Sequence, residues 1–512
     1  MLVKTYGSAV HGIDAITVTI EVNVTQGIKF LMVGLPDNAV KESQQRIDSA
    51  LRENGYKIPG KKIIINLAPA DIRKEGSSYD LPLAIGIMAA SEQIKIGQLN
   101  RYVIMGELSL DGSILPIKGA LPIAINARKE GFEGLIIPKD NAKEAAVVDH
   151  LNVFGVENIK QVIELFNNTG NLKPVTVNTR EEFYKQQITS DLDFADVKGQ
   201  ENVKRALEIA AAGGHNVIMI GPPGSGKTML AKRIPTILPP LQLREALETT
   251  IIHSVSGKIE KETSLMSQRP FRSPHHTISD IALVGGGIFP QPGEISLAHN
   301  GVLFLDELPE FKRSVLEVLR QPLEDRKITI SRSRFTIEYP ASFMLVASMN
   351  PCPCGYYNHP TKECVCAPGM VQKYLNRISG PLLDRIDIHL EVIPVPFNSL
   401  SEIKPSEPSK LIRQRVISAR KIQTDRFTDI ERVYCNAQMT SKLIRKYAIP
   451  DAAGQHLLKN AMEKLGLSAR AYDRILKVAR TIADLDQSLC IRPEHLAEAI
   501  NYRSLDRENW GN

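Results

Sequence analysis

Hydrophobic and polar positions alternate with two different periods in the first third of the chain. Residues 15–24 alternate at every second position, which is typical of a half-buried strand. Residues 62–67 have the apolar, β-branched composition of another strand. Residues 37–54 have a helical pattern and are followed by Gly55, a residue favoured just past a helix end. Strands and helices therefore mix, and residues 1–165 are predicted to form an α/β or α+β domain.

The rest of the chain changes character three times. Residues 166–193 are polar and lose periodicity, which predicts a linker. Residues 194–395 again mix strand and helix patterns and are predicted to form a second α/β unit. Residues 396–408 contain several prolines and are predicted to be another linker. Residues 409–512 have helical periodicity nearly throughout, so an all-α domain is expected there.

Composition narrows the class of protein. With 512 residues, of which 43% are hydrophobic and 23% charged, the chain is expected to fold into several globular domains. Its net charge of +6 permits a polyanionic partner but does not require one. No apolar run approaches the roughly 18 residues that cross a bilayer, and the first residues lack a signal-peptide pattern. We therefore expect a cytoplasmic protein without a membrane partner.

A glycine-rich segment between an apolar strand and a helix predicts a nucleotide site. Residues 216–220 have the strand pattern, and residues 229–232 follow in the helix. In such a loop, backbone N–H groups surround a phosphate, the lysine reaches the β and γ oxygens, and the threonine hydroxyl binds Mg²⁺. ATP and Mg²⁺ are therefore the expected cofactors. The segment consists of Gly221, Pro222, Pro223, Gly224, Ser225, Gly226, Lys227 and Thr228.

A second apolar strand ends in two adjacent carboxylates. Residues 301–305 lead directly into Asp306 and Glu307. Asp306 is placed to hold Mg²⁺ together with Thr228, and Glu307 is placed to orient or deprotonate the attacking water. Because the phosphate-binding loop lies upstream, this pair predicts ATP hydrolysis.

Three further polar residues follow in an order that suits phosphoryl transfer. Asn350 ends a strand, Arg385 follows a short helix, and Arg470 opens a helix of the all-α domain. Taken alone, each arginine could equally form a surface salt bridge. The order of motifs resembles the AAA+ ATPases, which implies that Asn350 is sensor 1, Arg385 the finger that reaches a neighbouring subunit's γ-phosphate within a ring, and Arg470 sensor 2. The residues that this resemblance places near the adenine are Val197, Gly199 and Gln200.

Two insertions in the second α/β unit bear on the substrate. Residues 269–287 are too rich in proline and glycine for a plain helix and are expected to form a projecting loop or hairpin. Within this insertion, His275 and His276 lack further ligands at metal-binding spacing, so structural roles are expected for them.

The second insertion, residues 326–338, is predicted to be a hairpin of two short strands. Its turn would hold Arg332 and Arg334 forward, where two guanidinium groups suit phosphate contacts without base reading. Arg326 and Lys327 add positive charge at its start. An ordinary solvated hairpin is the alternative. Insertions at both places resemble the AAA+ clade with helix-2 and pre-sensor-1 hairpins, and in DNA motors of that clade the hairpins line the pore.

Four of the six cysteines gather just after sensor 1, in the pattern C-x-C, nine residues, C-x-C. Four thiolates could close a tetrahedral Zn²⁺ site, with His359 as a spare ligand. Four reduced thiols without metal are the alternative. Zinc here would be structural, because four thiolates leave no open position for a substrate. The four residues are Cys352, Cys354, Cys364 and Cys366.

A further resemblance is carried by three segments of the first domain: residues 75–84, 105–119 and 134–141. Residues 1–165 resemble the Lon protease domain, an α/β fold of the ribosomal S5 domain 2 type, in which a Ser–Lys dyad cleaves peptides. Ser78 matches the serine, but Leu121 occupies the lysine's place and Lys118 lies three residues early. A serine without a positioned base is a poor nucleophile, so we expect the fold without the protease chemistry.

Three more segments extend the resemblance over nearly the whole chain: residues 272–277, 292–307 and 350–356. The chain resembles the magnesium-chelatase-like AAA+ proteins of the YifB and ComM type. This resemblance implies a hexameric DNA helicase that acts on single-stranded and branched DNA. It implies branch migration during homologous recombination, integration of transforming DNA, and recombination proteins as partners. An ATP-dependent protein remodeller related to the chelatase ATPase subunit and a Lon-like protease are the alternatives.

Overall fold

The computed structural model divides into two units by the contacts within each. The described residues are 1–95, 97–185, 191–260, 263–287, 290–332, 335–357, 359, 361–367, 369–395, 406–431 and 433–503. The first unit comprises residues 1–187, 242–267 and 290–292, and the second comprises residues 188–241, 268–289 and 293–512. Residues 242–267 thus lie within the predicted ATPase core by sequence but belong to the first unit by contact.

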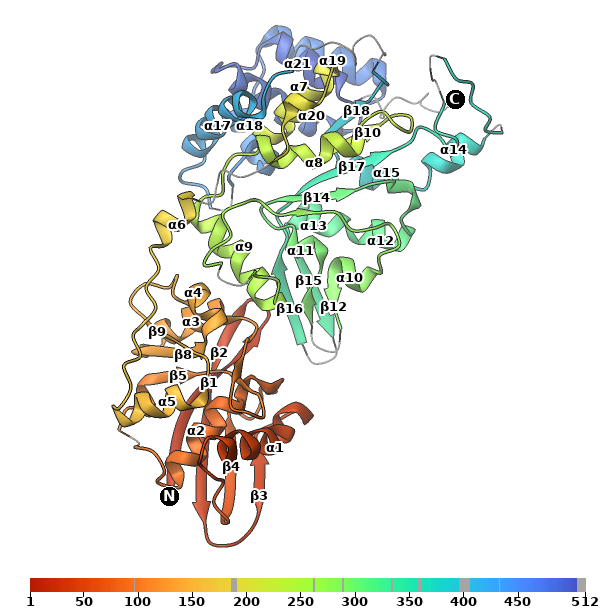
Figure 1. Ribbon diagram of the computed structural model, residues 1–512. Coiled ribbons are helices and arrows are strands. Elements are labelled where there is room, and N and C mark those ends of the chain that lie inside the picture. Colours follow the sequence, from red (N-terminus) through yellow and green to blue (C-terminus); the bar gives the residue numbers. More distant parts are fainter. Residues whose placement is uncertain are drawn as a thin grey trace. The chain divides into compact units, whose positions relative to one another are not determined.

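The first unit is built on a seven-stranded sheet (Figure 1). β1 pairs antiparallel with β2, and β2 pairs antiparallel with β4, whereas the other neighbours run parallel. In sheet order the strands are β3 (Phe30–Val33), β4 (Lys62–Ala68), β2 (Asp14–Thr25), β1 (Leu2–His11), β5 (Tyr102–Ile104), β8 (Gly134–Pro138) and β9 (Asn152–Val156). Alternate side chains of β2 from Val18 to Val24 are buried, which confirms the predicted strand at residues 15–24.

Helices complete the first unit. Asp37 caps the first of them, because its carboxylate accepts a hydrogen bond of 2.8 Å from the N–H of Val40 that the helix start leaves open. The second helix is buried at every residue, as the apolar sequence from Leu81 to Ala90 requires, and its first residue, Asp80, pairs with Arg46. The helices are α1 (Asn38–Glu53), α2 (Asp80–Ala90), α3 (Ala120–Lys129), α4 (Lys139–Ala145), α5 (Ile159–Asn167), α6 (Thr179–Lys185) and α9 (Leu243–Ser256). A small antiparallel pair is formed by β6 (Glu107–Leu108) and β7 (Ile114–Leu115).

A parallel sheet of five strands organises the second unit (Figure 1). In sheet order the strands are β11 (Phe271–Arg272), β14 (Val302–Leu305), β17 (Met344–Met349), β10 (Val217–Ile220) and β18 (Ile388–Glu391). All residues of β10, β14 and β17 are buried, which fits their continuous apolar sequences. The helices along this part of the chain are α7 (Glu201–Gly213), α8 (Lys227–Ile237), α10 (Asp280–Val284), α11 (Glu294–Leu297), α12 (Arg313–Val318), α13 (Arg320–Asp325), α14 (Met370–Leu375) and α15 (Gly380–Leu383).

The two insertions differ in structure. The second contains β15 (Lys327–Arg332) and β16 (Phe335–Pro340), which pair antiparallel as the sequence predicts for a hairpin. The first contains the short strand β11 and the helix α10, so it is more helical than a simple loop or hairpin. The serine at the start of α10, Ser279, accepts a hydrogen bond of 3.2 Å from the N–H of Ala282 and so caps this helix.

The end of the chain is helical, as predicted. The helices are α17 (Ser409–Arg426), α18 (Ser441–Tyr447), α19 (Ala452–Leu465), α20 (Ala469–Leu485) and α21 (Pro493–Asn501). Figure 1 shows α17 and α20 beside α7, and contacts join all three. Their apolar residues belong to the same hydrophobic core as the parallel sheet, so these helices and the sheet are packed as one body.

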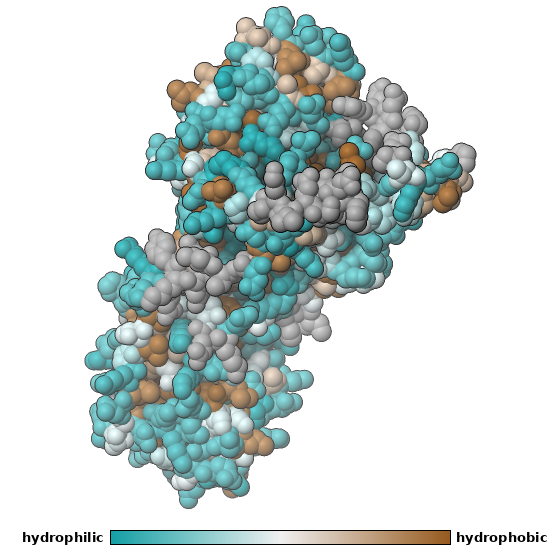
Figure 2. Space-filling view, turned by 45° about the horizontal axis from the view of Figure 1, so that its top comes forward, coloured by the Kyte–Doolittle hydropathy of each residue, from teal (hydrophilic) through white to brown (hydrophobic). Residues whose placement is uncertain are grey.

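Among the described residues, none of the helices has both the length and the apolar composition that crossing a bilayer requires. On the face drawn in Figure 2, hydrophilic residues predominate and hydrophobic ones are interspersed among them.

A buried carboxylate joins the parallel sheet to the last helices. Asp387, which is 1% exposed and precedes β18, accepts a hydrogen bond of 3.0 Å from the N–H of Asn216 just before β10. Arg474 on α20 lies 3.1 Å from the same carboxylate, and His215 lies 3.4 Å from it. Burial raises the pKa of Asp387, but the charge of Arg474 and the hydrogen bond of His215 outweigh it and hold the pKa below its ordinary range. This ion pair therefore acts at neutral pH.

We predict that Asp387→Asn destabilises the second unit by about 3 kcal/mol, because it removes the buried carboxylate that pairs with the partly buried Arg474. Asp384→Asn removes the partner of a side chain that is 59% exposed, Arg470, and is expected to cost at most about 1 kcal/mol. Denaturant titration followed by circular dichroism measures both. Equal stability of the two variants would contradict the assignment.

Candidate active site

A loop whose conformation depends on its glycines joins β10 to α8. Gly224 and Gly226 have φ of +78° and +89°, in the left-handed region that favours glycine. A Cβ on Gly221 would lie 2.2 Å from the carbonyl oxygen of Val392, so this glycine permits the close approach of the loop to the segment after β18. The predicted strand, loop and helix are all present, and the N-terminus of α8 begins at Lys227.

The ammonium group of Lys227 lies inside this loop. Its Nζ donates hydrogen bonds of 2.7 Å to the Gly221 carbonyl and 2.9 Å to the Pro222 carbonyl. The Oδ1 atom of Asn350 lies 3.3 Å from the same Nζ. Burial lowers the pKa of Lys227, while the carboxylates of Asp306 and Glu307 act in the opposite direction. The predicted lysine, acid pair and asparagine therefore converge at one end of the sheet.

Oxygen ligands suited to Mg²⁺ lie side by side next to this lysine. The hydroxyl of Thr228 donates a hydrogen bond of 2.8 Å to Oδ2 of Asp306. The hydroxyl of Ser348, on β17, donates to Oδ1 of the same carboxylate. A threonine hydroxyl and a carboxylate are hard oxygen donors of the kind that Mg²⁺ prefers. Sequence reasoning missed Ser348, which is recognisable only from the pairing of β17 beside β14.

Glu307 is the exposed member of the acid pair. Its backbone has φ of +54°, a left-handed conformation that costs a non-glycine residue about 1 kcal/mol or more. The side chain is 56% exposed, and its Oε2 lies 3.6 Å from Nδ1 of His276. The rings of His275 and His276 are 4.1 Å apart. The arrangement suits a carboxylate that contacts a water molecule, and the histidine pair, predicted as structural, lies beside it.

The segment predicted to face the adenine borders the phosphate-binding loop. Nε2 of Gln200 donates hydrogen bonds of 2.8 Å to the Ser225 carbonyl and 3.2 Å to the Ile393 carbonyl. Val197 is buried, and Gly199 has φ of +65° and packs against Val395.

The two predicted sensor and finger arginines have partners outside the loop. Arg385 donates a hydrogen bond of 2.7 Å to the Pro381 carbonyl and a second one to the Glu324 carboxylate. Its side chain is only 12% exposed. Arg470, near the start of α20, is 3.4 Å from Oδ2 of Asp384. Their roles at a γ-phosphate stay predictions, and Glu324 is a partner that sequence reasoning did not identify.

The four cysteines lie together in a single cluster, with their sulfur atoms all within 4.8 Å of one another. The Cys352 sulfur is 3.3 Å from that of Cys354 and 3.7 Å from that of Cys364, and the last two are 3.5 Å apart. A tetrahedron with Zn–S bonds of about 2.3 Å has edges of about 3.8 Å, so the spacing fits zinc. The fourth member of the cluster is Cys366.

The predicted spare ligand, His359, is engaged otherwise. Its Nδ1 accepts hydrogen bonds from the N–H groups of Thr361 (3.2 Å) and Lys362 (3.1 Å). The sulfur of Cys352 accepts a hydrogen bond of 3.3 Å from the N–H of Tyr357, which orients this side chain. Among the described residues, the four cysteines are thus the group whose ligand atoms lie close enough together to hold a metal ion.

Positive charge at the second insertion is distributed differently from the prediction. Arg326, at the base of the hairpin, donates a hydrogen bond of 3.3 Å to the Ala437 carbonyl before α18 and is turned inward. Lys327 forms an ion pair of 2.8 Å across the hairpin with Glu338. The side chain of Arg332 and the whole of Arg334 lie outside the described residues. Arg326 thus contacts the chain before the last helices, and its predicted role in DNA binding stays a prediction.

The site geometry agrees with comparisons to known proteins. Residues 193–400 match the family described as magnesium chelatase, subunit ChlI, and residues 406–503 match its C-terminal domain. Residues 20–141 match the family described as subunit ChlI of Mg-chelatase. The chain is 46% identical over 506 residues to the uncharacterized protein YifB of Escherichia coli, which covers 98% of this chain and 96% of that protein. It is equally 46% identical to the competence protein ComM of Haemophilus influenzae, over 98% and 97% of the two chains.

The chain belongs to the magnesium-chelatase-like YifB/ComM family. Membership in this AAA+ family implies ATPase activity with ATP and Mg²⁺, and the mixed α/β architecture with its parallel sheet fits this fold. The arrangement of Lys227, Asp306 and Asn350 supplies the matching chemistry.

The chain also has a more distant similarity that covers a smaller part of it. Lon protease 2 of Bacillus subtilis is 31% identical over 159 residues, which are 28% of this chain and 27% of that protein. Leu121, at the place of the Lon lysine, is fully buried, and its N–H donates a hydrogen bond of 3.0 Å to Oε1 of Glu144. The stem of Lys118 packs against Gly257, just after α9. These contacts give both residues packing roles.

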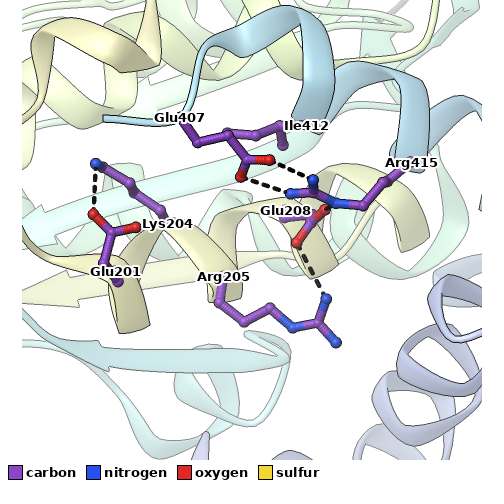
Figure 3. Close-up of a pocket in the computed structure, with 7 residues that line it drawn as sticks. All are labelled: Glu201, Lys204, Arg205, Glu208, Glu407, Ile412 and Arg415. Carbon is purple, nitrogen blue, oxygen red and sulfur yellow. Dashed lines mark hydrogen bonds and ion pairs between the residues drawn. The ribbon is translucent and has the colours of Figure 1, made fainter. Parts of the chain in front are cut away.

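A separate pocket of about 270 Å³ lies between α7 and the segment that opens α17 (Figure 3). Arg415 forms a bidentate pair with Glu407 and also contacts Glu208, and Lys204 lies 3.0 Å from Glu201. Arg205 pairs with Glu208 as well. Because its charged side chains neutralise one another, this pocket is a structural ion-pair network of the ATPase core.

We predict that Glu307→Gln retains ATP binding but lowers hydrolysis by about 10²–10⁴-fold, because it removes a base or water-orienting group. Lys227→Ala should instead weaken nucleotide binding about tenfold or more. Equilibrium titration with ATP and a phosphate-release assay separate these effects.

The matched control is Glu317→Gln, which removes a carboxylate from the surface of α12 and should change neither quantity. Wild-type turnover in Glu307→Gln would disprove the role of the acid pair.

Proposed function

We propose that the chain is an ATP-driven hexameric DNA helicase that promotes branch migration during homologous recombination, including the integration of transforming DNA. ATP and Mg²⁺ are its cofactors, and the four-cysteine cluster holds structural Zn²⁺. Its partners are single-stranded and branched DNA, further copies of the chain and recombination proteins. The observation that carries the proposal is the convergence of Lys227, Thr228, Asp306 and Asn350 at one end of the sheet, beside a two-stranded insertion, in a chain that is 46% identical to a competence protein.

The chemistry of the site supports the proposed ring. Phosphoryl transfer needs a cation near the developing charge of the γ-phosphate. Arg385 lies in an ion pair with Glu324, an acid that is itself 57% exposed. Exchange of that partner for a phosphate of a neighbouring subunit would complete the site, and this supports an assembly in which each active site is shared.

DNA contact is assigned to the turn of the second insertion. β15 and β16 pair as far as Arg332 and Phe335, so Arg332 ends the first strand and Arg334 follows it in the sequence, outside the described residues. Guanidinium groups bind phosphates bidentately and without sequence preference, as a motor that passes over any sequence requires. Lys327 at the base is a further proposed contact, which would exchange its ion pair with Glu338 for a DNA phosphate.

The main alternative is an ATP-dependent remodeller of a partner protein. It is favoured by one observation, the match of residues 193–400 to a magnesium chelatase subunit. A Lon-like protease has less support, because Ser78 lacks a lysine at the expected place and buried Leu121 occupies it.

The decisive experiment compares ATP hydrolysis by the full chain without DNA, with single-stranded DNA and with a four-way junction. We expect both DNAs to raise the rate, because a translocase couples its cycle to its track. A rate that ignores DNA, together with no DNA retention on a filter, would favour the remodeller.

We predict that Arg332→Ala combined with Arg334→Ala weakens DNA binding on all sequences. The slope of log affinity against log salt should flatten by about one unit per lost contact. A filter-binding titration at several salt concentrations measures this slope. Lys459→Ala with Lys464→Ala removes the same charge from α19 and is the control. An equal loss in both double variants would mean that net charge, and not the hairpin, controls binding.

A further inference from the structure

The four-cysteine loop packs directly against the phosphate-binding loop. Gly355, between the two pairs of cysteines, has φ of +84°. A Cβ at this position would lie 2.4 Å from Cδ and 2.8 Å from Cγ of Pro223. Contacts under 3.0 Å require a shift of the neighbouring atom. Here the neighbour is the rigid ring of Pro223 in the phosphate-binding loop (the P-loop, residues 221–228). The glycine hydrogen therefore fits where no side chain can.

The same loop reaches the nucleotide site at a second point. Asn350, whose Oδ1 is 3.3 Å from Nζ of Lys227, is two residues before Cys352. Cys352 is fully buried, and the N–H of Tyr357 donates to its sulfur. Cys354, the residue before Gly355, is the next sulfur of the cluster. Two of the four cysteines thus lie on the short stretch between the contacts with Lys227 and with Pro223.

A metal at the cluster would tie residues 350–355 to the second pair of cysteines. Cys364 and Cys366 come from the return of the loop, and their sulfurs lie within 4.8 Å of the first pair. Four bonds to one ion would close the loop and set the positions of both cysteine pairs. Because Asn350 and Gly355 flank the first pair, a displaced loop would move both contacts with the nucleotide site.

We propose that Zn²⁺ at this cluster braces the phosphate-binding loop, so that ATP affinity depends on the metal. The inference rests on the proposed zinc and ATP sites and adds a regulatory link between them. Loss or oxidation of the cluster would weaken ATP binding without touching a residue of the P-loop.

The test measures zinc per chain and the affinity for a non-hydrolysable ATP analogue in the full-length protein. Cys364→Ser with Cys366→Ser should lose the zinc and bind the analogue about tenfold more weakly. Gly355→Ala should keep the zinc and still bind more weakly, because its methyl group displaces Pro223. Circular dichroism verifies that each variant is folded.

Two matched controls isolate the effect. Gly369→Ala introduces the same backbone strain, at φ of +74°, but its Cβ has no atom within 4 Å, so zinc and affinity should stay at wild-type levels. Cys490→Ser removes an exposed thiol outside the cluster and should do the same.

Different failures have different meanings. If the folded double cysteine variant loses zinc but binds the analogue like wild type, or if Gly355→Ala binds it like wild type, the brace is overturned. Wild-type protein purified without zinc that binds the analogue normally also overturns it, while leaving the ATPase proposal intact. Wild-type protein that holds zinc but fails to bind the analogue would overturn both the brace and the proposed function.

Discussion

Parallel pairing of β17 between β10 and β14 is the constraint on which the nucleotide site depends. The register places Met349 beside Ile220 and Ala347 beside Leu305. Because parallel strands end at the same edge, the residues that follow them meet there. The P-loop, the acid pair and Asn350 all follow such ends, which brings Lys227 and Asn350 within 3.3 Å. Packing of these buried strands therefore sets the geometry of the chemistry.

The buried carboxylate of Asp387 connects the parallel sheet to the last helices. It contacts the chain just before β10 and Arg474 on α20, while Arg385 lies only two residues upstream. Breaking a buried ion pair is costly, so the sheet edge and α20 are held together as one body. Arg326 and Lys477 both donate to the Ala437 carbonyl, which fastens the base of the hairpin to the same region. The base of the hairpin and α20 are thus joined through one carbonyl, and the Asn216 side chain donates to the backbone carbonyl of Arg385 near the same carboxylate.

Local patterns predicted much of this arrangement, and long-range contacts account for what they missed. The helix at residues 37–54 appears as α1, and the strand, loop and helix of the P-loop appear because apolar period and glycine chemistry act within a few residues. Ser348 looked like an ordinary strand residue, since only the pairing of β17 with β14 brings its hydroxyl to Asp306. Arg326 looked like hairpin charge, since only the tertiary fold turns it inward.

The first unit is formed by several separate segments of the chain, although its sequence resembles a protease domain. The chain passes between the two units several times, so the first unit is no module on a single tether. Its helix α9 follows the P-loop helix in sequence and packs on α3, where the N–H of Gly119 donates 3.1 Å to the Ser254 carbonyl. A Cβ on Gly257 would lie 2.9 Å from Cε of Lys118. The stem of Lys118 therefore packs against the end of α9, and moving this side chain toward Ser78 to serve as a base would remove that contact.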